Sequence, residues 1–126
     1  MKNGLLSFTL VSVLLSSPFS FADEESASGQ IIKECGKQPV QPEVPNGRQA
    51  SKEDMLAAQR AMKAFLEEGN TFMECLGKLE RSLGDDATDE QKATIVIFHN
   101  KTVDDQQAIA DLFNAAVRAF NGKEGS

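Results

Sequence analysis

The sequence predicts an all-α protein: a long antiparallel two-helix hairpin with an N-terminal proline-rich extended strap pinned by a disulfide. Three observations lead to this fold class. Two long stretches repeat apolar residues at three- and four-residue steps, a short acidic turn joins them, and two cysteines, Cys35 and Cys75, lie before and within the first stretch. The length beyond the N-terminal leader suits one small domain rather than two.

Residues 1–22 are typical of a cleaved signal peptide. Lys2 is basic, the run from Leu5 to Leu15 is apolar, and Ser20 and Ala22 supply the small side chains that signal peptidase requires. The apolar run is shorter than the roughly 20 residues of a bilayer-spanning helix, which disfavours the alternative of a retained membrane anchor. We therefore expect a periplasmic or secreted protein, cleaved after Ala22, with no membrane insertion of the mature chain.

Two non-helical segments are expected before the hairpin. Residues 23–30 are acidic and rich in small residues, which predicts a flexible acidic tail. Residues 31–50 form the predicted strap, in which three prolines recur at three-residue spacing: Pro39, Pro42 and Pro45. This spacing places the prolines on one edge of a polyproline II helix, and Asn46-Gly47 predicts a turn at its end. An SH3-type ligand is the alternative interpretation of the prolines.

The first long helix is predicted over residues 51–83. Ser51 and Asp54 have the spacing of a capping box, and Gly84 is a suitable C-terminal cap. Its apolar positions continue through four heptads, as in a coiled coil: Met55, Ala58, Met62, Phe65, Gly69, Phe72, Leu76, Leu79 and Leu83.

The second long helix is predicted over residues 88–121, with 122–126 as a C-terminal tail. Thr88 and Gln91 have the spacing of another capping box, and Asn121-Gly122 is expected to end the helix. Its inward stripe is expected to contain Ile95/Val96, His99, Thr102/Val103, Gln106, Ile109/Ala110, Phe113, Ala116/Val117 and Phe120. A tight turn between two long helices requires them to lie antiparallel, which makes residues 31–121 one helical hairpin domain.

Cys35 and Cys75 are expected to form an intramolecular disulfide. At 1.5 Å per helical residue and 3.1 Å per extended residue, a strap of about 50 Å can run back along about 36 Å of the first helix and reach Cys75. An intermolecular bond and two free thiols are the alternatives. Two cysteines and one histidine lack the spacing of a four-ligand zinc site.

His99 is the single histidine and is expected on the inner half of its helix. Together with Gly69 and Asn70 it should form the thinnest and most polar layer of the hairpin. The favoured interpretation is a partly buried imidazole bonded to Asn70 or to a carbonyl; a small-ligand or metal site centred on His99 is the alternative. Nucleophilic catalysis would need a serine or cysteine beside it, and the second helix has no serine. We expect no enzyme, no cofactor and no metal.

Composition narrows the class of partner. The chain has 19 acidic and 13 basic residues, a net charge of −6, and neither Trp nor Tyr. Negative charge and the lack of stacking side chains disfavour nucleic acid as a partner. An apolar stripe on a two-helix hairpin instead favours binding of another protein through the hairpin, as an adaptor, inhibitor or chaperone-like module. The expected interaction face contains Phe65, Phe72, Phe113 and Phe120. Alternatively the strap covers this stripe, or a second copy does so in a self-associating envelope protein.

Several short motifs occur in a fixed order between residues 35 and 120: Cys35, Pro39, Pro42, Pro45-Asn46-Gly47, Ala50-Ser51, Asp54-Met55, Cys75-Leu76, Val103-Asp104, Phe113-Asn114 and Val117-Arg118-Ala119. This order resembles that of small secreted proteobacterial helical-hairpin proteins. The resemblance implies a bacterial periplasmic setting and a hairpin fold. It implies no activity, cofactor or catalytic residue.

Overall fold

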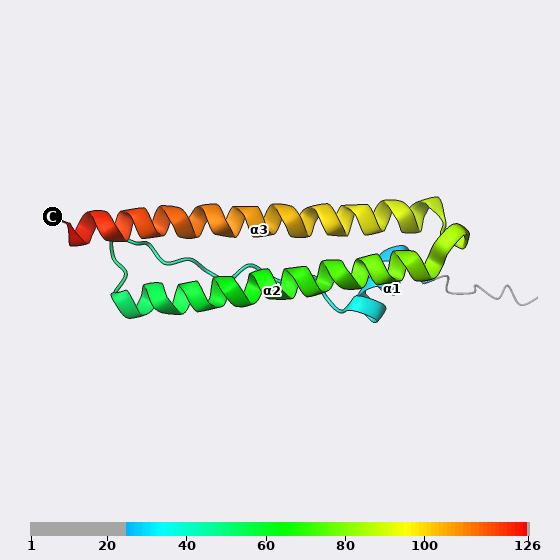
Figure 1. The fold of residues 1–126 in the computed structure, drawn as a ribbon, viewed down its shortest axis with the longest axis horizontal. Coiled ribbons are helices and arrows are strands. Elements are labelled where there is room, and N and C mark those ends of the chain that lie inside the picture. The colour runs from blue at the N-terminus through cyan, green and yellow to red at the C-terminus, as the bar shows by residue number, and fades with distance from the viewer. Residues whose placement is uncertain (1–24, 126) are drawn as a thin grey trace, which may run out of the picture.

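The computed structural model describes residues 25–125, and this part of the chain is all-α (Figure 1). Its elements are, in order, α1 (Ala27–Cys35), α2 (Lys52–Leu83), the short 3-10 helix η1 (Gly84–Asp86) and α3 (Asp89–Glu124). The long helices α2 and α3 lie antiparallel, as predicted, while α1 packs against both of them near the η1 end. The predicted signal peptide and its cleavage site after Ala22 lie outside the described residues.

The predicted N-terminal caps of both long helices are correct. Ser51 accepts a hydrogen bond from the Asp54 N–H while the Asp54 carboxylate accepts one from the Ser51 N–H, and Thr88 and Gln91 make the same reciprocal pair. These bonds satisfy amide groups that have no partner inside the helix. Gly84 ends α2 with φ at +55°, a conformation that favours glycine.

The predicted end of α3 at Asn121 was wrong. The helix continues to Glu124, and the Gly125 N–H donates to the Asn121 carbonyl. Asn121-Gly122 therefore continues the hydrogen-bonded backbone instead of turning out of it.

The region before the strap also differs from its prediction. Residues 27–35, divided in the prediction between the tail and the strap, form helix α1. The Ser26 hydroxyl caps it by accepting from the Gly29 N–H, and Gly36, with φ at +77°, ends it. Ile31 is 1% exposed, because α1 places it against α2 and α3. The prediction of extended backbone from residue 31 onward was therefore wrong; the extended segment begins at Gly36.

The strap, residues 36–51, runs along the groove between α2 and α3 towards the C-terminal end of α3 (Figure 1). Its burial repeats every three residues, the period of a polyproline II helix. One edge is half-buried against α3 and the core and consists of Gln38, Gln41 and Val44. A second edge is half-buried beside α2 and consists of Pro39, Pro42 and Pro45. The third edge is exposed and consists of Val40, Glu43 and Asn46. The proline edge thus faces the protein itself, in agreement with a structural strap.

The hydrophobic core has two clusters. The cluster near η1 consists of Ile31, Phe72, Leu76, Leu79 and Ile95. The cluster near the C-terminal end of α3 consists of Ala50, Met55, Ala58, Phe113 and Ala116. α1 completes the first cluster, and the end of the strap completes the second.

Candidate functional site

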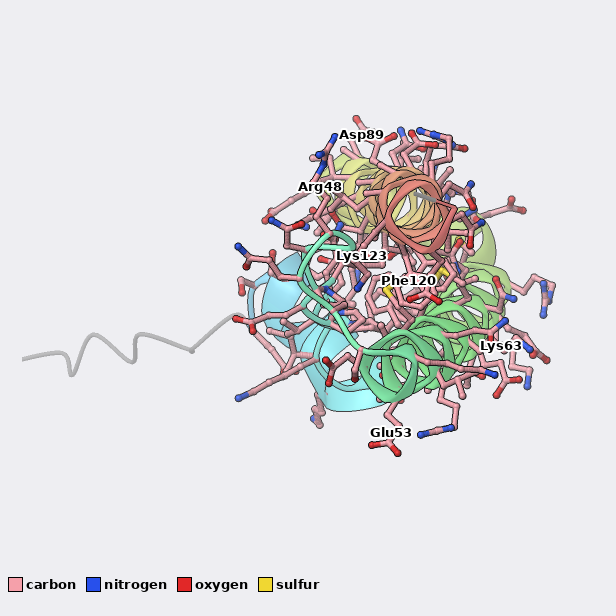
Figure 2. The ribbon with its side chains drawn as sticks, turned by 90° about the vertical axis from the view of Figure 1, so that its left-hand side faces the viewer. Arg48, Glu53, Lys63, Asp89, Phe120 and Lys123 are labelled. Carbon is pink, nitrogen blue, oxygen red and sulfur yellow. A yellow bond between two sulfur atoms is a disulfide. The ribbon has the colours of Figure 1, made fainter. Side chains whose placement is uncertain are left out.

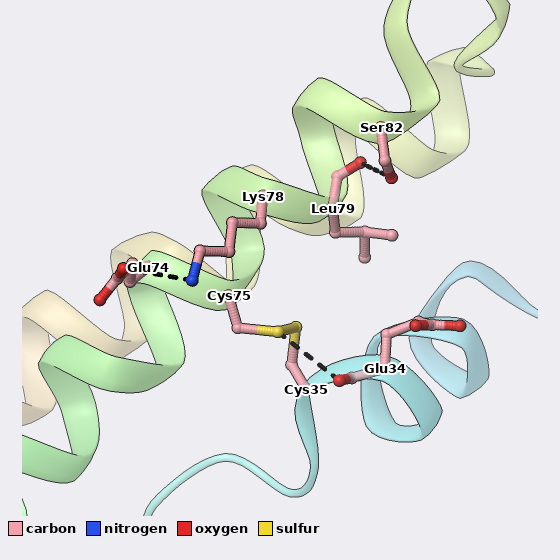
Figure 3. The surroundings of a disulfide bond; sticks show 7 residues. All are labelled: Glu34, Cys35, Glu74, Cys75, Lys78, Leu79 and Ser82. Atoms are coloured by element: carbon pink, nitrogen blue, oxygen red, sulfur yellow. Dashed lines mark hydrogen bonds and ion pairs between the residues drawn. A yellow bond between two sulfur atoms is a disulfide. The ribbon is translucent and has the colours of Figure 1, made fainter.

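The disulfide joins Cys35 to Cys75, with 5.6 Å between their Cα atoms, so the predicted pairing is correct (Figure 3). Its structural role was predicted incorrectly. Cys35 is the last residue of α1, and the bond therefore ties a short helix to α2 instead of pinning an extended strap. The Cys75 Sγ lies 3.6 Å from the Glu34 carbonyl oxygen; this is a contact and no hydrogen bond, because a disulfide sulfur carries no proton. A stable disulfide indicates an oxidising compartment.

A polar layer separates the two clusters of the core. Gln106 of α3 donates from its amide to the Leu66 carbonyl (2.9 Å) and to the Asn70 Oδ1 (3.1 Å), both on α2. Gly69 makes room for this side chain, because a Cβ at residue 69 would lie 2.6 Å from the Gln106 Nε2. The layer thus fixes the register of α2 against α3 by side chain to backbone hydrogen bonds.

Thr102 extends this layer towards the strap. Its side chain is buried, its hydroxyl donates to the Phe98 carbonyl at 2.8 Å, and it accepts from the Gln38 amide at 3.0 Å. Gln41, one strap turn further on, donates to the Asp105 carbonyl. The strap is therefore held to α3 by two glutamines, a contact that the sequence pattern did not reveal.

His99 is exposed, so its predicted place in the polar layer was wrong. The layer does contain the predicted Gly69 and Asn70, but Thr102 and Gln106 take the part assigned to the imidazole. Within residues 25–125 no three side chains among His, Cys, Asp and Glu cluster closely enough to hold a metal ion.

The predicted interaction face is not a free surface in this structure. Phe65, Phe72 and Phe113 are buried, and Phe120 is half-buried. Phe72 packs in the cluster that Ile31 of α1 completes, while the other cluster is completed from the strap. The covering segments are thus α1 and the strap. Cover by the strap was one of the alternatives that the sequence left open, whereas cover by a helix α1 was not predicted.

A different set of apolar side chains remains accessible on the other side of the hairpin. Val96 is 53% and Val103 43% exposed, and they lie seven residues apart on α3. The strap contacts α3 at Phe98 and Asp105, which follow Val96 and Val103 by two residues each. Two residues correspond to a rotation of about 200° around the helix axis. The valines therefore lie on the flank that the strap leaves uncovered.

On α2 the same relation holds. Ala64 and Thr71 line a hollow beside the strap, and Leu66 and Met73, two residues after each, lie on the opposite flank and are half-buried. We call the uncovered side of the hairpin the open flank. It comprises Leu66 and Met73 of α2 and Val96, Val103, Ala110 and Val117 of α3.

Comparison with known proteins finds no matching family model, no matching curated protein and no matching solved structure. Of the helices between residues 25 and 125, none combines the length and the apolar character needed to cross a membrane.

Proposed function

We propose that this is a non-enzymatic periplasmic or secreted protein that binds a helix of another protein on its open flank. The observation that carries the proposal is the pair Val96 and Val103, two half-exposed β-branched side chains at heptad spacing on the side of the hairpin that no segment of residues 25–125 covers. The open flank replaces the buried phenylalanines as the site of interaction.

The spacing of the open flank favours a helical partner. The four α3 residues lie at 96, 103, 110 and 117, and the two α2 residues lie at 66 and 73, so both rows repeat every seven residues. Such rows form the holes into which apolar side chains of a third helix insert in coiled-coil packing. A third helix would extend this packing on the side opposite the strap.

The polar residues beside the open flank also favour protein binding. On α3 the neighbouring exposed side chains include His99, Asn100, Gln107 and Asn114, none of which is acidic or permanently charged. Charged side chains do border the open flank, among them the exposed Lys92 one helical turn before Val96 and Asp104 next to Val103, so the uncharged surface is a strip along α3 between Val96 and Val117. Interfaces between proteins are depleted of charge at their centres in the same way.

The disulfide and the leader-like residues 1–22 support an extracytoplasmic location, and the resemblance to secreted proteobacterial hairpins supports the periplasm. The acidic composition supports a protein partner over nucleic acid.

Self-association through the same flank is the second candidate function. Two hairpins that meet along their heptad rows would form a four-helix bundle, and the half-exposed valines would lie at its centre.

The test is site-specific photocrosslinking of the full-length protein in the cells that express it. A benzophenone side chain at residue 107, where the exposed Gln107 lies one helical turn after Val103, should form adducts with a partner. The same group at residue 112, where Leu112 is exposed on the outer side of α3, should not. Val96→Lys with Val103→Lys should abolish the adducts, because charge would be buried in the interface.

The matched control is Ile97→Lys with Leu112→Lys, which changes exposed apolar residues of α3 outside the open flank. Adducts that survive the Val96/Val103 variant and disappear in the control would contradict the proposal. Light scattering of the purified protein identifies the partner class: a dimer that the Val96/Val103 variant converts to monomer would establish self-association in place of a separate partner.

A further inference from the structure

Two segments at one end of the molecule contain basic but no acidic side chains. Residues 44–52 and 112–123 contain no Asp or Glu, although the sequence has 19 acidic residues. The two segments supply four cations, Arg48, Lys52, Arg118 and Lys123. The strap turn and the last turns of α3 bring these segments together, so a basic region forms on an acidic protein.

A hollow of about 520 Å³ lies between the strap turn and α3. It is lined by Arg48, Arg118 and Lys123 together with the small residues Ala119 and Gly122. Figure 2 looks at this end of the molecule: Lys123 and Phe120 lie towards its middle, Arg48 lies beside α3, and the acidic Glu53 lies on the far side of α2. Three cationic groups therefore surround a space whose other walls carry no charge.

The chain holds the Arg48 turn firmly against α3. The Asn46 Oδ1 accepts from the Arg48 N–H at 3.0 Å, and the Asn46 carbonyl accepts from the Ala50 N–H at 2.9 Å. Gly47 lies so close to α3 that a Cβ there would be 2.0 Å from the Ala116 carbonyl oxygen. The Arg48 backbone is thus fixed in relation to Arg118 before any ligand arrives, which lowers the ordering cost of binding.

Lys123 takes part in building the hollow. Its ammonium group donates to the Ala50 carbonyl and lies 4.8 Å from the centre of the Phe120 ring. Lys123 is therefore partly engaged with the protein itself. Its charge also adds, after the two hydrogen bonds with Ser51, to the lowering of the pKa of Asp54. The two arginines are the groups that remain for a ligand.

Neither guanidinium forms an ion pair with a carboxylate of residues 25–125, where the three ion pairs involve Lys33, Lys78 and Lys101. Arg118 has no acidic neighbour one helical turn away on either side. The negative end of the α3 dipole stabilises the positive charge of Lys123 in the last turn. Because this effect fades within one turn, it gives no structural reason for the positive charges of Arg118 and Arg48.

We propose that this hollow is a binding site for a phosphate-type oxyanion, held by Arg48 and Arg118 with Lys123 adding positive charge. Guanidinium groups bind phosphate through paired N–H donors, and two of them from separate segments can contact different oxygens of one anion. The phosphate could belong to a soluble molecule or to a lipid headgroup, which present the same chemistry to the arginines.

The test is a titration of the disulfide-bonded protein with inorganic pyrophosphate, followed by ¹H–¹⁵N NMR. Amide shifts should concentrate in residues 46–49 and 115–123. Arg48→Gln with Arg118→Gln should weaken binding by roughly tenfold or more, because charge-assisted hydrogen bonds are lost. The matched control, Arg60→Gln with Lys63→Gln on α2, removes the same charge away from the hollow and should weaken binding by less than about twofold.

A second arm distinguishes the sources of the phosphate. Sedimentation with phosphatidylglycerol vesicles that depends on both arginines would assign a lipid headgroup, and pyrophosphate binding without sedimentation would assign a soluble ligand. Equal weakening in the control variant, or no binding to either probe, would overturn the proposal. Val96→Lys with Val103→Lys should leave pyrophosphate binding unchanged, so this site and the open flank are tested separately.

Discussion

Replacing both cysteines with serine should release α1 while α2 and α3 stay paired. The disulfide holds the C-terminal end of α1 on α2. Besides this bond, α1 is held by two buried side chains, Ala27 and Ile31, and by the hydrogen bond that the Gln91 amide donates to Gln30. A nine-residue helix is too short to be stable alone in water. Without the covalent tie, its docking depends mainly on the burial of Ile31, which contributes about 2–3 kcal/mol, with smaller contributions from Ala27 and from the Gln30–Gln91 hydrogen bond.

The stability change follows from the length of the closed loop. Cys35 and Cys75 are 40 residues apart, for which the chain-entropy model gives about 4 kcal/mol. For a domain of roughly 100 residues, this corresponds to a melting temperature lower by about 15–30 °C. This loss of stability is a large share of the roughly 5–15 kcal/mol by which a small domain is stable.

Circular dichroism melting gives the temperature shift, and hydrogen exchange of the peptide covering residues 25–36 gives the state of α1. The variant should remain helical, lose protection in this peptide and melt at a lower temperature. Ile31→Ala with the disulfide intact is the control: it removes the packing and keeps the tie, and should cost about 2–5 kcal/mol. A double-serine variant that melts within about 5 °C of the parent and keeps α1 protected would refute the reasoning.

Two further predictions concern the polar layer and the start of α2. Gly69→Ala should gain less stability in urea unfolding than Gly77→Ala. Each replacement improves helix propensity by about 1 kcal/mol, but a Cβ at residue 69 would displace Gln106 from the Leu66 carbonyl at a cost of about 0.5–1.5 kcal/mol, whereas the nearest neighbour of a Cβ at residue 77 is the flexible Arg81 side chain at 3.4 Å. Equal gains would contradict this role for the layer. The pKa of Asp54 is lowered by hydrogen bonds with Ser51, chiefly by the bond that the Ser51 backbone N–H donates. The Asp54 carboxylate therefore stabilises the protein fully at pH values above the ordinary carboxyl pKa. This stabilisation is lost as the pH falls through the lowered pKa. The difference in unfolding free energy between the parent and Asp54→Asn should accordingly shrink as the pH falls from the ordinary carboxyl pKa through the lowered pKa of Asp54. Urea unfolding at a series of pH values measures this difference. A difference that stays constant with pH would contradict the prediction.

The elements predictable from the sequence are those set by local chemistry. The two capping boxes, the glycine at the end of α2 and the long heptad rows each depend on residues within a few positions of one another. The cysteine pairing was also predictable, because the reach of the chain constrains it strongly.

Helix α1 was missed although its local signals were present. Ser26 and Gly36 cap its two ends, but Gly29 and the small polar residues around it have low helical preference. The helix is stabilised by the burial of Ile31 and by the bond from Cys35, both of which depend on residues 40 or more positions away. Composition alone therefore indicated a flexible tail.

The misplacement of His99 has a different cause. A bare two-helix hairpin would centre its buried stripe between the two helices, which places His99 on the inner side. The strap adds a third surface and moves the buried line of α3 towards Thr102 and Ile109, both nearly inaccessible to solvent. His99 and Val103 are left on the side turned away from the strap.

This shift connects the fold to the proposed function. A hairpin of two helices needs cover for its apolar stripe, and here α1 and the strap supply that cover on one side only, held by the disulfide and by two glutamine contacts. The same packing that buries the phenylalanines leaves Val96 and Val103 exposed opposite the strap. Because the tie of α1 to α2 is covalent, the proposed exchange of partners on the open flank would not uncover the phenylalanine core.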